Sequence, residues 1–271
     1  MLIDRFGREI DYLRVSVTDR CNYRCVYCMP ESGISLKPHE RILDFESITA
    51  IAAAAAELGI EKIRLTGGEP LVRKDIEVLT GMLGSIEKIK DLTMTTNAVF
   101  LSEDMAGILR RAGLTRINIS LDTLDPARFG EITRGGDITD VFKGIESAKN
   151  AGLDPVKINM IVFSGTTAEE VEMMRGFCLE KGLVLQTIKH FSLYNRDEMI
   201  GDVDLFDRPA PCSECNRIRL TADGFLKPCL FSDEEIKVDM NNIEKSILEA
   251  VSGKPFQGTA CCNRSMYQIG G

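Results

Sequence analysis

Six short runs in the first two thirds of the chain alternate between apolar and polar residues. The first of them, for example, sets Leu13, Val15 and Val17 against Arg14 and Ser16. Successive side chains of a strand point to opposite faces, so this period of two predicts β-strands. The predicted strands cover residues 12–17, 62–66, 91–95, 116–120, 156–162 and 184–189.

Amphipathic segments between these strands predict helices, and each is followed by a glycine, which commonly terminates a helix: Gly59, Gly84, Gly113, Gly152 and Gly182. The longest interval contains a polar stretch, residues 125–136, which predicts a loop with a short helix. Alternating strands and helices are typical of a parallel sheet with helices outside it. A closed barrel needs eight such units, so we predict an α/β fold, an open, partial (β/α)6 parallel barrel.

The polar positions of these strands share one face of the predicted sheet, which would be the barrel lumen. Five cationic residues fall on this face: Arg14, Lys62, Arg64, Arg116 and Lys157. The chain as a whole has a formal net charge of −8. A cationic lumen in an acidic protein predicts a small anionic ligand. The alternative is that cations at the strand ends reach solvent.

Composition and charge exclude several other classes of protein. The chain has 271 residues, 44% of them hydrophobic, which is enough for a large buried core. The acidic net charge disfavours general binding of nucleic acid. Residues 1–5 show no secretory signal, and no apolar run reaches the ~18 residues of a membrane span. Nine cysteines in such a chain indicate metal chemistry in a reducing cytoplasm.

Three cysteines follow the first predicted strand in the sequence DRCNYRCVYCMP: Cys21, Cys25 and Cys28. A structural zinc site uses four protein ligands, whereas three thiolates suit a [4Fe–4S] cluster whose fourth iron stays open. Their position after a strand places them at the C-terminal face of the barrel, where active sites of such folds lie. A zinc site or free buried thiols are the alternatives.

A glycine-rich turn, Gly67-Gly68-Glu69-Pro70, follows the second predicted strand. Two glycines without Cβ atoms would allow the backbone to approach a ligand closely. Taken alone, the same residues are compatible with an ordinary turn. Their position one strand after the cysteines favours a ligand site.

A second set of three cysteines lies beyond the sixth strand: Cys212, Cys215 and Cys229. Residues 191–211, before it, lack a helical or strand period. Asp223-Gly224 separates two β-rich runs, residues 217–221 and 225–230, and predicts a hairpin that returns Cys229 to the other two cysteines. This set favours a second cluster. A zinc site completed by Cys261 or Cys262 is the alternative.

The motifs together resemble the GTP 3′,8-cyclase family of radical S-adenosylmethionine (SAM) enzymes. The resemblance spans nearly the whole chain and rests on DYLRVSVTDRCNYRCVYCMP, KIRLTGGEPLVRKD, MTTN, RINISLD, VKINM, CSECNRIRLTADG and SMYQIGG. It implies a partial barrel of radical SAM type over residues 1–189. It also implies a small C-terminal region, residues 190–271, that carries the second iron–sulfur cluster and ends in a Gly-Gly tail.

The resemblance also implies roles for individual residues. The first cluster would be bound by Cys21, Cys25 and Cys28, and the second by Cys212, Cys215 and Cys229. SAM would contact Tyr27, Gly68, Glu69, Thr95, Ser120 and Lys157. GTP would contact Arg14, Lys62, Arg64, Arg217 and Arg219. Catalysis would involve Arg217, Arg219 and the tail residues Gly270 and Gly271, the tail inserting into the barrel.

The implied reaction begins with reductive cleavage of SAM to a 5′-deoxyadenosyl radical, which removes hydrogen from C3′ of GTP before the ribose carbon attacks guanine C8. The product, 3′,8-cyclo-7,8-dihydro-GTP, is the first intermediate of molybdopterin (Mo/W cofactor) biosynthesis. The implied partners are a flavodoxin- or ferredoxin-type electron donor and the downstream cyclic pyranopterin monophosphate synthase. No nucleic acid or membrane partner is expected, and the sequence leaves open whether the chain forms a homodimer.

Several positions depart from the family pattern, and they bear on the substrate. The segment before Cys212 is shorter than expected, Lys189-His190-Phe191 replaces a Glu-x-Met stretch, and Gln186 stands where an arginine is usual. Ala98 occupies a usual glycine position. Two alternatives therefore stay open: a radical SAM enzyme acting on a peptide or another small molecule, and an iron–sulfur protein without a substrate.

Overall fold

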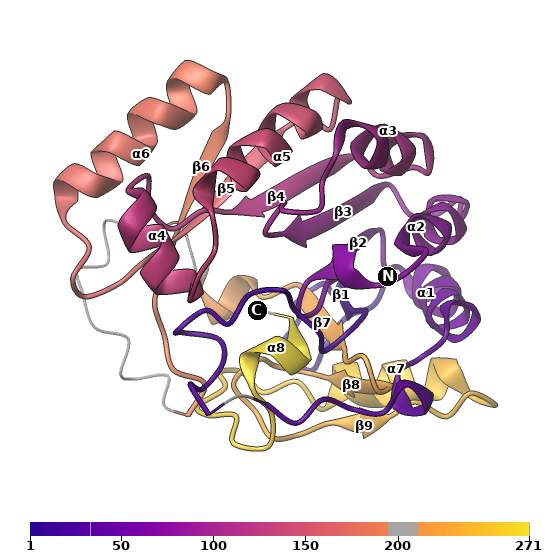
Figure 1. The fold of residues 1–271 in the computed structure, drawn as a ribbon. Helices are drawn as coiled ribbons and strands as arrows, with labels where there is room; N and C mark the ends of the chain where they lie inside the picture. The colour runs from indigo at the N-terminus through magenta and orange to yellow at the C-terminus, as the bar shows by residue number, and fades with distance from the viewer. Residues whose placement is uncertain (33, 195–206, 208–210, 271) are drawn as a thin grey trace.

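A curved, nine-stranded sheet forms the centre of the molecule (Figure 1). The structure is a computed structural model that describes residues 1–32, 34–194, 207 and 211–270. The strands run in the order β6-β5-β4-β3-β2-β1-β7-β8-β9. They are β1 (Tyr12–Ser16), β2 (Lys62–Thr66), β3 (Asp91–Thr96), β4 (Arg116–Ser120), β5 (Val156–Val162), β6 (Val184–Lys189), β7 (Arg217–Leu220), β8 (Phe225–Lys227) and β9 (Ile236–Lys237).

The first six strands are parallel to one another and leave the sheet open, which confirms the partial (β/α)6 barrel. Their bounds agree with the sequence prediction to within one residue. Alternate residues enter the apolar core, where Leu13, Val15, Ile63 and Leu65 have no exposed surface. The period of two is therefore real, and the polar positions between these residues face the opposite side.

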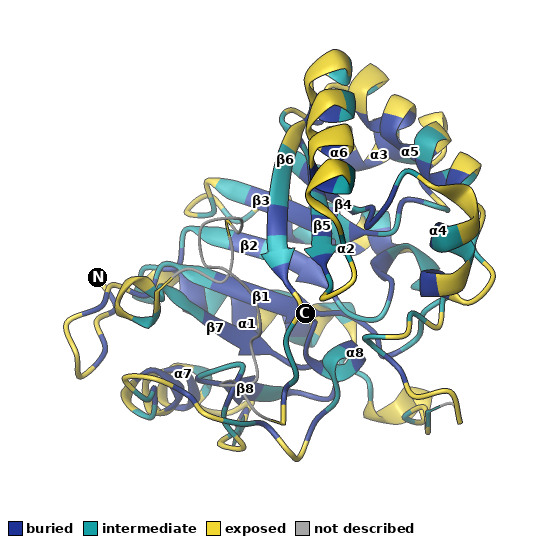
Figure 2. Ribbon diagram, turned by 90° about the vertical axis from the view of Figure 1, so that its left-hand side faces the viewer, coloured by how far each residue is buried: buried dark blue, intermediate teal, exposed yellow. Residues whose placement is uncertain are grey.

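The helices, most of which cover the outer face of the sheet, expose their outward sides to solvent (Figure 2). They are α1 (Phe45–Leu58), α2 (Ile76–Gly84), α3 (Glu103–Arg111), α4 (Pro126–Thr133), α5 (Ile138–Asn150), α6 (Ala168–Lys181), α7 (Ile243–Ser252) and α8 (Met266–Ile269). Gly59 and Gly182 terminate α1 and α6 in the left-handed conformation, as predicted. Gly84 instead forms the last helical residue of α2. The predicted loop between Gly113 and Gly152 contains the short helix α4.

The strand β7 extends the sheet beyond the six predicted strands. It pairs in parallel with β1, so that Leu13 lies opposite Ile218 and Arg14 opposite Arg219. The predicted hairpin at Asp223-Gly224 joins β7 to the antiparallel strand β8. An edge strand has unpaired backbone groups, and β7 satisfies those of β1. The two predicted parts of the chain therefore share one sheet, while the division after residue 189 stays a prediction.

Most of residues 191–211, namely 195–206 and 208–210, lies outside the described residues. Within the described part of the chain, no helix is long and apolar enough to cross a membrane. All nine cysteines are free thiols, in agreement with the interpretation that they serve metal chemistry and not a disulfide framework.

Candidate active site

Two adjoining cavities lie on the polar side of the sheet. The first, about 190 Å³, is lined by the three N-terminal thiols and the C-terminal ends of the strands; we call it the thiol cavity. The second, about 490 Å³, is lined by the N-terminal halves of the strands and by the second cysteine set; we call it the cationic cavity. Asn159, Ile188 and Phe191 line both, so the cavities share a wall.

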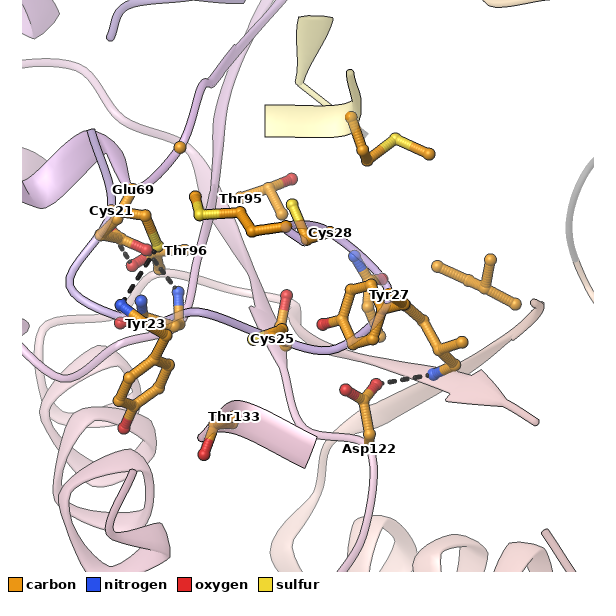
Figure 3. A pocket seen from close by; sticks show the side chains of 18 of the residues that line it. Cys21, Tyr23, Cys25, Tyr27, Cys28, Glu69, Thr95, Thr96, Asp122 and Thr133 are labelled. Carbon is orange, nitrogen blue, oxygen red and sulfur yellow. Dashed lines mark hydrogen bonds between the residues drawn. The ribbon is translucent and has the colours of Figure 1, made fainter. Parts of the chain in front are cut away.

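The cysteines of the first set project into the thiol cavity from the loop after β1 (Figure 3). A tight turn forms where the backbone N–H of Cys28 donates to the carbonyl of Cys25 at 3.0 Å. Burial raises the pKa of Cys21 to about 11 and that of Cys25 to about 12. The free thiols would therefore stay protonated at neutral pH, and their conversion to thiolates needs a compensating cation such as iron.

Glu69 is a buried carboxylate at the edge of the same cavity. It accepts hydrogen bonds from Thr96 Oγ1 at 2.6 Å, from the Asn97 N–H at 2.7 Å and from the Leu71 N–H at 3.0 Å. Burial nevertheless raises its pKa to about 7. A carboxylate has about four acceptor positions, so Glu69 can still receive a ligand ammonium.

The two glycines before Glu69 serve chain packing. A Cβ at Gly68 would lie 2.1 Å from the carbonyl oxygen of Arg20, and one at Gly67 would lie 2.6 Å from that of Thr18. The same loops are joined by hydrogen bonds from the Gly68 N–H to Thr18 and from the Glu69 N–H to Arg20, both 2.8 Å. The missing side chains therefore bring the turn against the cysteine loop. The sequence analysis expected these glycines to let the backbone approach a ligand; in the structure they let it approach the backbone of Thr18 and Arg20.

Of the described residues that line the cationic cavity, seven are cationic and two, Asp91 and Glu214, are acidic. The cations are Arg14, Lys62, Arg64, Arg116, Lys157, Arg217 and Arg219. All five cations predicted on the polar face therefore share one cavity. The strand-end residues Lys62 and Arg116 form ion pairs with Asp11 and Asp91, so part of the predicted charge is neutralised there.

Three arginines form a row across neighbouring strands, because Arg14 lies opposite Arg64 on β2 and opposite Arg219 on β7. Adjacent strands are ~4.8 Å apart, so the row concentrates like charges. Burial and the neighbouring guanidinium of Arg219 hold the pKa of Arg14 well below its usual value. Burial and Arg217 lower the pKa of Arg219 to about 10. Such repulsion is relieved by an anionic ligand, and arginine matches phosphate oxygens in pairs.

The second cysteine set, Cys212, Cys215 and Cys229, lines the cationic cavity opposite these strands. No three His, Cys, Asp or Glu side chains of the described chain converge tightly enough to hold one metal ion, as zinc requires. Burial by itself raises the pKa of Cys215, but the ammonium of Lys254, the Arg217 N–H and nearby arginines bring it below its ordinary value. This thiol is thus prepared to act as a thiolate ligand.

Of the two further cysteines, one lies close to this set, because Cys229 packs against the apolar cluster that contains Cys261. Cys261 is buried in a small apolar cluster with Leu193, Phe231 and Ile269, and its thiol donates to Asn263 Oδ1 at 3.3 Å. Cys262 is exposed. Neither lines the cationic cavity, and neither completes a metal-binding group with the second set among the described residues, which disfavours the zinc alternative.

The C-terminal segment, as far as Gly270, enters the barrel between the two cavities. The carbonyl oxygen of Gly270 accepts a hydrogen bond of 2.8 Å from Arg219, and a Cβ at Gly270 would lie 2.1 Å from Thr66 Oγ1. Met266, at the start of α8, lines the thiol cavity. The resemblance implied this insertion; Gly271 lies outside the described residues.

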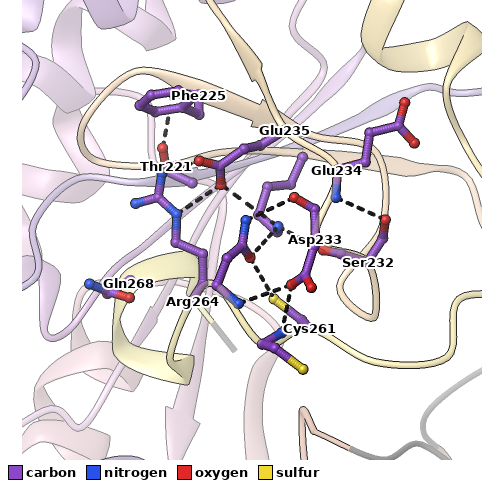
Figure 4. Close-up of polar contacts among 12 residues, drawn as sticks. Thr221, Phe225, Ser232, Asp233, Glu234, Glu235, Cys261, Arg264 and Gln268 are labelled. Carbon is purple, nitrogen blue, oxygen red and sulfur yellow. Dashed lines mark hydrogen bonds and ion pairs between the residues drawn. The ribbon is translucent and has the colours of Figure 1, made fainter.

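A buried ion-pair network holds the segment that leads into this tail (Figure 4). The guanidinium of Arg264 donates to both carboxylate oxygens of Asp223, at 3.0 and 2.9 Å, and to both of Glu235, at 2.8 Å each. Arg264 is only 7% exposed. Asp223 belongs to the β7–β8 hairpin, so this network fixes the tail to the region that carries the second cysteine set.

Comparison with known proteins decides the family. A model of the radical SAM superfamily matches residues 15–178, and one described as Molybdenum Cofactor Synthesis C matches residues 174–256. GTP 3′,8-cyclase of Petrotoga mobilis is 39% identical over 324 residues, covering 100% of both chains. That of Thermodesulfovibrio yellowstonii is 40% identical over 303 residues, covering 93% of this chain and 94% of the relative.

This chain belongs to the GTP 3′,8-cyclase family. The alignment with the Petrotoga mobilis relative exceeds the 271 residues of this chain, so that relative contains segments absent here. The fold is also that of Streptococcus suis SuiB bound to S-adenosylmethionine, with a TM-score of 0.69, 17% identity and coverage of 92% of this chain and 65% of that chain. For anSMEcpe with bound AdoMet the TM-score is 0.65 at 16% identity, covering 90% of this chain and 81% of that chain.

The GTP 3′,8-cyclase family uses SAM and [4Fe–4S] clusters, and the two cavities fit these groups. In the thiol cavity, the hydroxyl of Thr95 is buried without a hydrogen-bond partner among the described residues, as a polar ligand would require. Tyr27, Gly68, Glu69 and Ser120 line the same cavity. Lys157 lies instead in the cationic cavity, so its predicted contact with SAM would have to cross the shared wall.

The sequence analysis did not predict several residues that the structure places at the site. Thr96 holds Glu69, and Asp122, whose pKa burial raises to about 6, lines the thiol cavity and accepts the Ile161 N–H at 2.8 Å. Lys254 and Arg264 lie in segments whose sequence patterns are typical of solvent-exposed surface. A lone lysine after a helix and a lone arginine before the tail give no local signal. Only the fold brings them to the site.

Proposed function

We propose that this protein is a GTP 3′,8-cyclase that converts GTP to 3′,8-cyclo-7,8-dihydro-GTP in the first step of molybdopterin (Mo/W cofactor) biosynthesis. The observation that carries the proposal is the shared wall between a thiol cavity suited to SAM and a cationic cavity suited to a triphosphate. A radical formed from SAM in the thiol cavity would therefore lie next to the ribose of a nucleotide bound in the cationic cavity.

In the thiol cavity, Cys21, Cys25 and Cys28 would bind the first cluster, and Glu69 would hold the ammonium of SAM, assisted by Thr95 and Ser120. When bound, these cofactors supply the organic radical that removes hydrogen from the ribose. The protein aligns the reactants and excludes water. Tyr27 adds an apolar wall through its ring contact with Phe163, 5.8 Å between centroids.

In the cationic cavity, the row of Arg14, Arg64 and Arg219 would bind the triphosphate of GTP, together with Arg217, Lys62 and Lys157. Cys212, Cys215 and Cys229 would bind the second cluster in the same cavity as the nucleotide. Gly270 would act through Arg219, because their hydrogen bond ties the tail to the nucleotide site. We further propose a flavodoxin- or ferredoxin-type donor, transfer of product to cyclic pyranopterin monophosphate synthase and a cytoplasmic location.

Anaerobic incubation of reconstituted protein with GTP, SAM and dithionite tests this proposal. Mass analysis after chromatographic separation should show equal amounts of 5′-deoxyadenosine and a cyclised product with the same mass as GTP, because the hydrogen lost from C3′ is replaced by one electron and one proton. SAM cleavage that GTP does not stimulate would favour a peptide or another small molecule as substrate. Absence of SAM cleavage would favour an iron–sulfur protein without a substrate.

A further inference from the structure

Lys254, which follows α7, is a buried cation. It is 1% exposed, and its ammonium has three hydrogen-bond acceptors, none of them a carboxylate. They are the carbonyl oxygens of Arg217 at 2.7 Å and Pro228 at 2.8 Å and the sulfur of Cys215 at 3.6 Å. Burying an ammonium costs several kcal/mol unless charge or hydrogen bonds compensate. A buried ammonium is stabilised by an anionic neighbour, and the thiolate of Cys215 can be that neighbour.

All three acceptors belong to the segments that carry the second cysteine set. Cys215 is a member of it, Arg217 follows two residues later, and Pro228 directly precedes Cys229. Lys254 thus connects the CxxC turn with the returning strand of the hairpin. One ammonium holds the two segments that the predicted cluster must bridge.

Arg8 supports the remaining cysteine from the other side. Its guanidinium donates to the carbonyl of Cys212 at 2.7 Å and to that of Pro255, next to Lys254, at 2.8 Å. Its charge is balanced by Asp4 at 2.7 Å. The charge of Arg8 is therefore neutralised by Asp4, whereas Lys254 places a positive charge without a carboxylate partner beside the thiol of Cys215.

We propose that Lys254 is a positioning residue whose fixed charge at Cys215 raises the reduction potential of the cluster held by Cys212, Cys215 and Cys229. The inference rests on the second cluster of the proposed function. One-electron reduction adds negative charge to a cluster already bound by thiolates. A cation beside one of these thiolates stabilises the reduced form more than the oxidised form, and burial limits the screening of that interaction.

The test is an anaerobic redox titration followed by electron paramagnetic resonance, in a Cys25→Ala background that leaves the second cluster as the source of signal. Lys254→Met should lower the reduced-to-oxidised ratio at a fixed potential at least tenfold, which is about 59 mV for one electron. Lys254→Arg should stay close to the parent. Lys245→Met, an exposed lysine at the other end of α7, is the matched control and should show no shift.

Lys254→Gln separates charge from hydrogen bonding, because its amide can still donate to the two carbonyls. It should keep the iron of the second cluster and shift the potential in the same direction as Lys254→Met. An unchanged potential in a neutral variant that retains iron would overturn the proposal. Loss of iron from both neutral variants would also overturn it, since Lys254 would then serve assembly. The titration needs neither GTP nor SAM, so a wrong substrate leaves its result interpretable.

Discussion

The guanidinium of Arg219 donates a hydrogen bond to the carbonyl oxygen of Gly270 at 2.8 Å, across 51 residues of sequence. Arg219 is 5% exposed and lines the cationic cavity, so this contact lies inside the barrel. Gly270 also lies against Thr66 and Gly67, at the C-terminal end of β2. The tail therefore connects the proposed GTP site with the turn that precedes Glu69.

Gly270→Ala should disrupt this connection. Its Cβ would meet Thr66 Oγ1 at 2.1 Å, and its φ of +64° is unfavourable for alanine. We expect cyclised product to fall at least ~10-fold, equivalent to ~1.4 kcal/mol of transition-state stabilisation, with iron content unchanged. Gly152→Ala is the control, because Gly152 has a φ of +72° but no atom within 4 Å of its Cβ position. Equal turnover in the two variants would contradict a role for the tail.

Arg217→Lys and Arg219→Lys test the pairing of arginines with the nucleotide. Lysine keeps the positive charge but loses the planar fork that matches phosphate oxygens in pairs. We expect product formation to fall at least ~10-fold in each variant, measured at saturating SAM, while both clusters assemble. Arg110→Lys, on the exposed side of α3, should be neutral. Unchanged turnover in both cavity variants would show that these arginines do not bind the substrate.

Cysteine substitutions should separate the two clusters. The reconstituted parent should contain about eight irons per chain, and Cys25→Ala and Cys215→Ala about four each. Cys25→Ala should form no 5′-deoxyadenosine, because SAM loses its electron source. Cys215→Ala should still cleave SAM slowly but yield no cyclised nucleotide. A parent with about four irons and stoichiometric zinc would contradict the second cluster.

Asp223 should make stability depend on pH. Burial alone would raise its pKa, but hydrogen bonds from Lys37, Thr221 and Arg264 lower the pKa to about 2 from its ordinary value of 3.8. A depressed carboxyl pKa contributes stability above the unfolded value, and this contribution is lost as pH falls from about 4 through about 2. At pH 7, Asp223→Asn should therefore lower the free energy of unfolding by ~2 kcal/mol.

Denaturant unfolding of the parent and the variant at pH 7 and near pH 3 measures this effect. The difference between them should shrink at the lower pH. Asp140→Asn removes an exposed ion pair with Lys143 and should cost less than ~1 kcal/mol at both. A pH-independent difference for Asp223→Asn would show that the charge of this carboxylate does not stabilise the fold.

Local periodicity explains why so much of the barrel could be predicted. The alternation of Leu13 and Val15 with Arg14 is a direct consequence of strand geometry, so strand bounds and the cationic face followed from it. The pairing of β7 with β1 could not be predicted in this way, since it joins residues ~200 positions apart whose local patterns do not encode each other. The β7–β8 hairpin could be predicted from the sequence, but its pairing with the edge strand β1 could not.

The site was predictable where spacing carries the chemistry. Both cysteine sets line the cavities expected for them, because a short loop in the first set and a hairpin in the second leave few arrangements for three thiols. Lys254, Arg264 and Thr96 were missed, since each acts through contacts that only the fold creates. Ala98 is a partial exception: it replaces the usual glycine and adopts a φ of +65°, so the departure visible in the sequence marks a strained backbone position.

The central claim is that a radical generated in the thiol cavity acts on GTP held in the cationic cavity. GTP carrying deuterium at C3′ tests it most directly, by mass analysis of the 5′-deoxyadenosine formed with SAM and dithionite under anaerobic conditions. The account predicts one deuterium in 5′-deoxyadenosine and its loss from the cyclised nucleotide. SAM cleavage in the presence of labelled GTP that leaves 5′-deoxyadenosine without deuterium would contradict it.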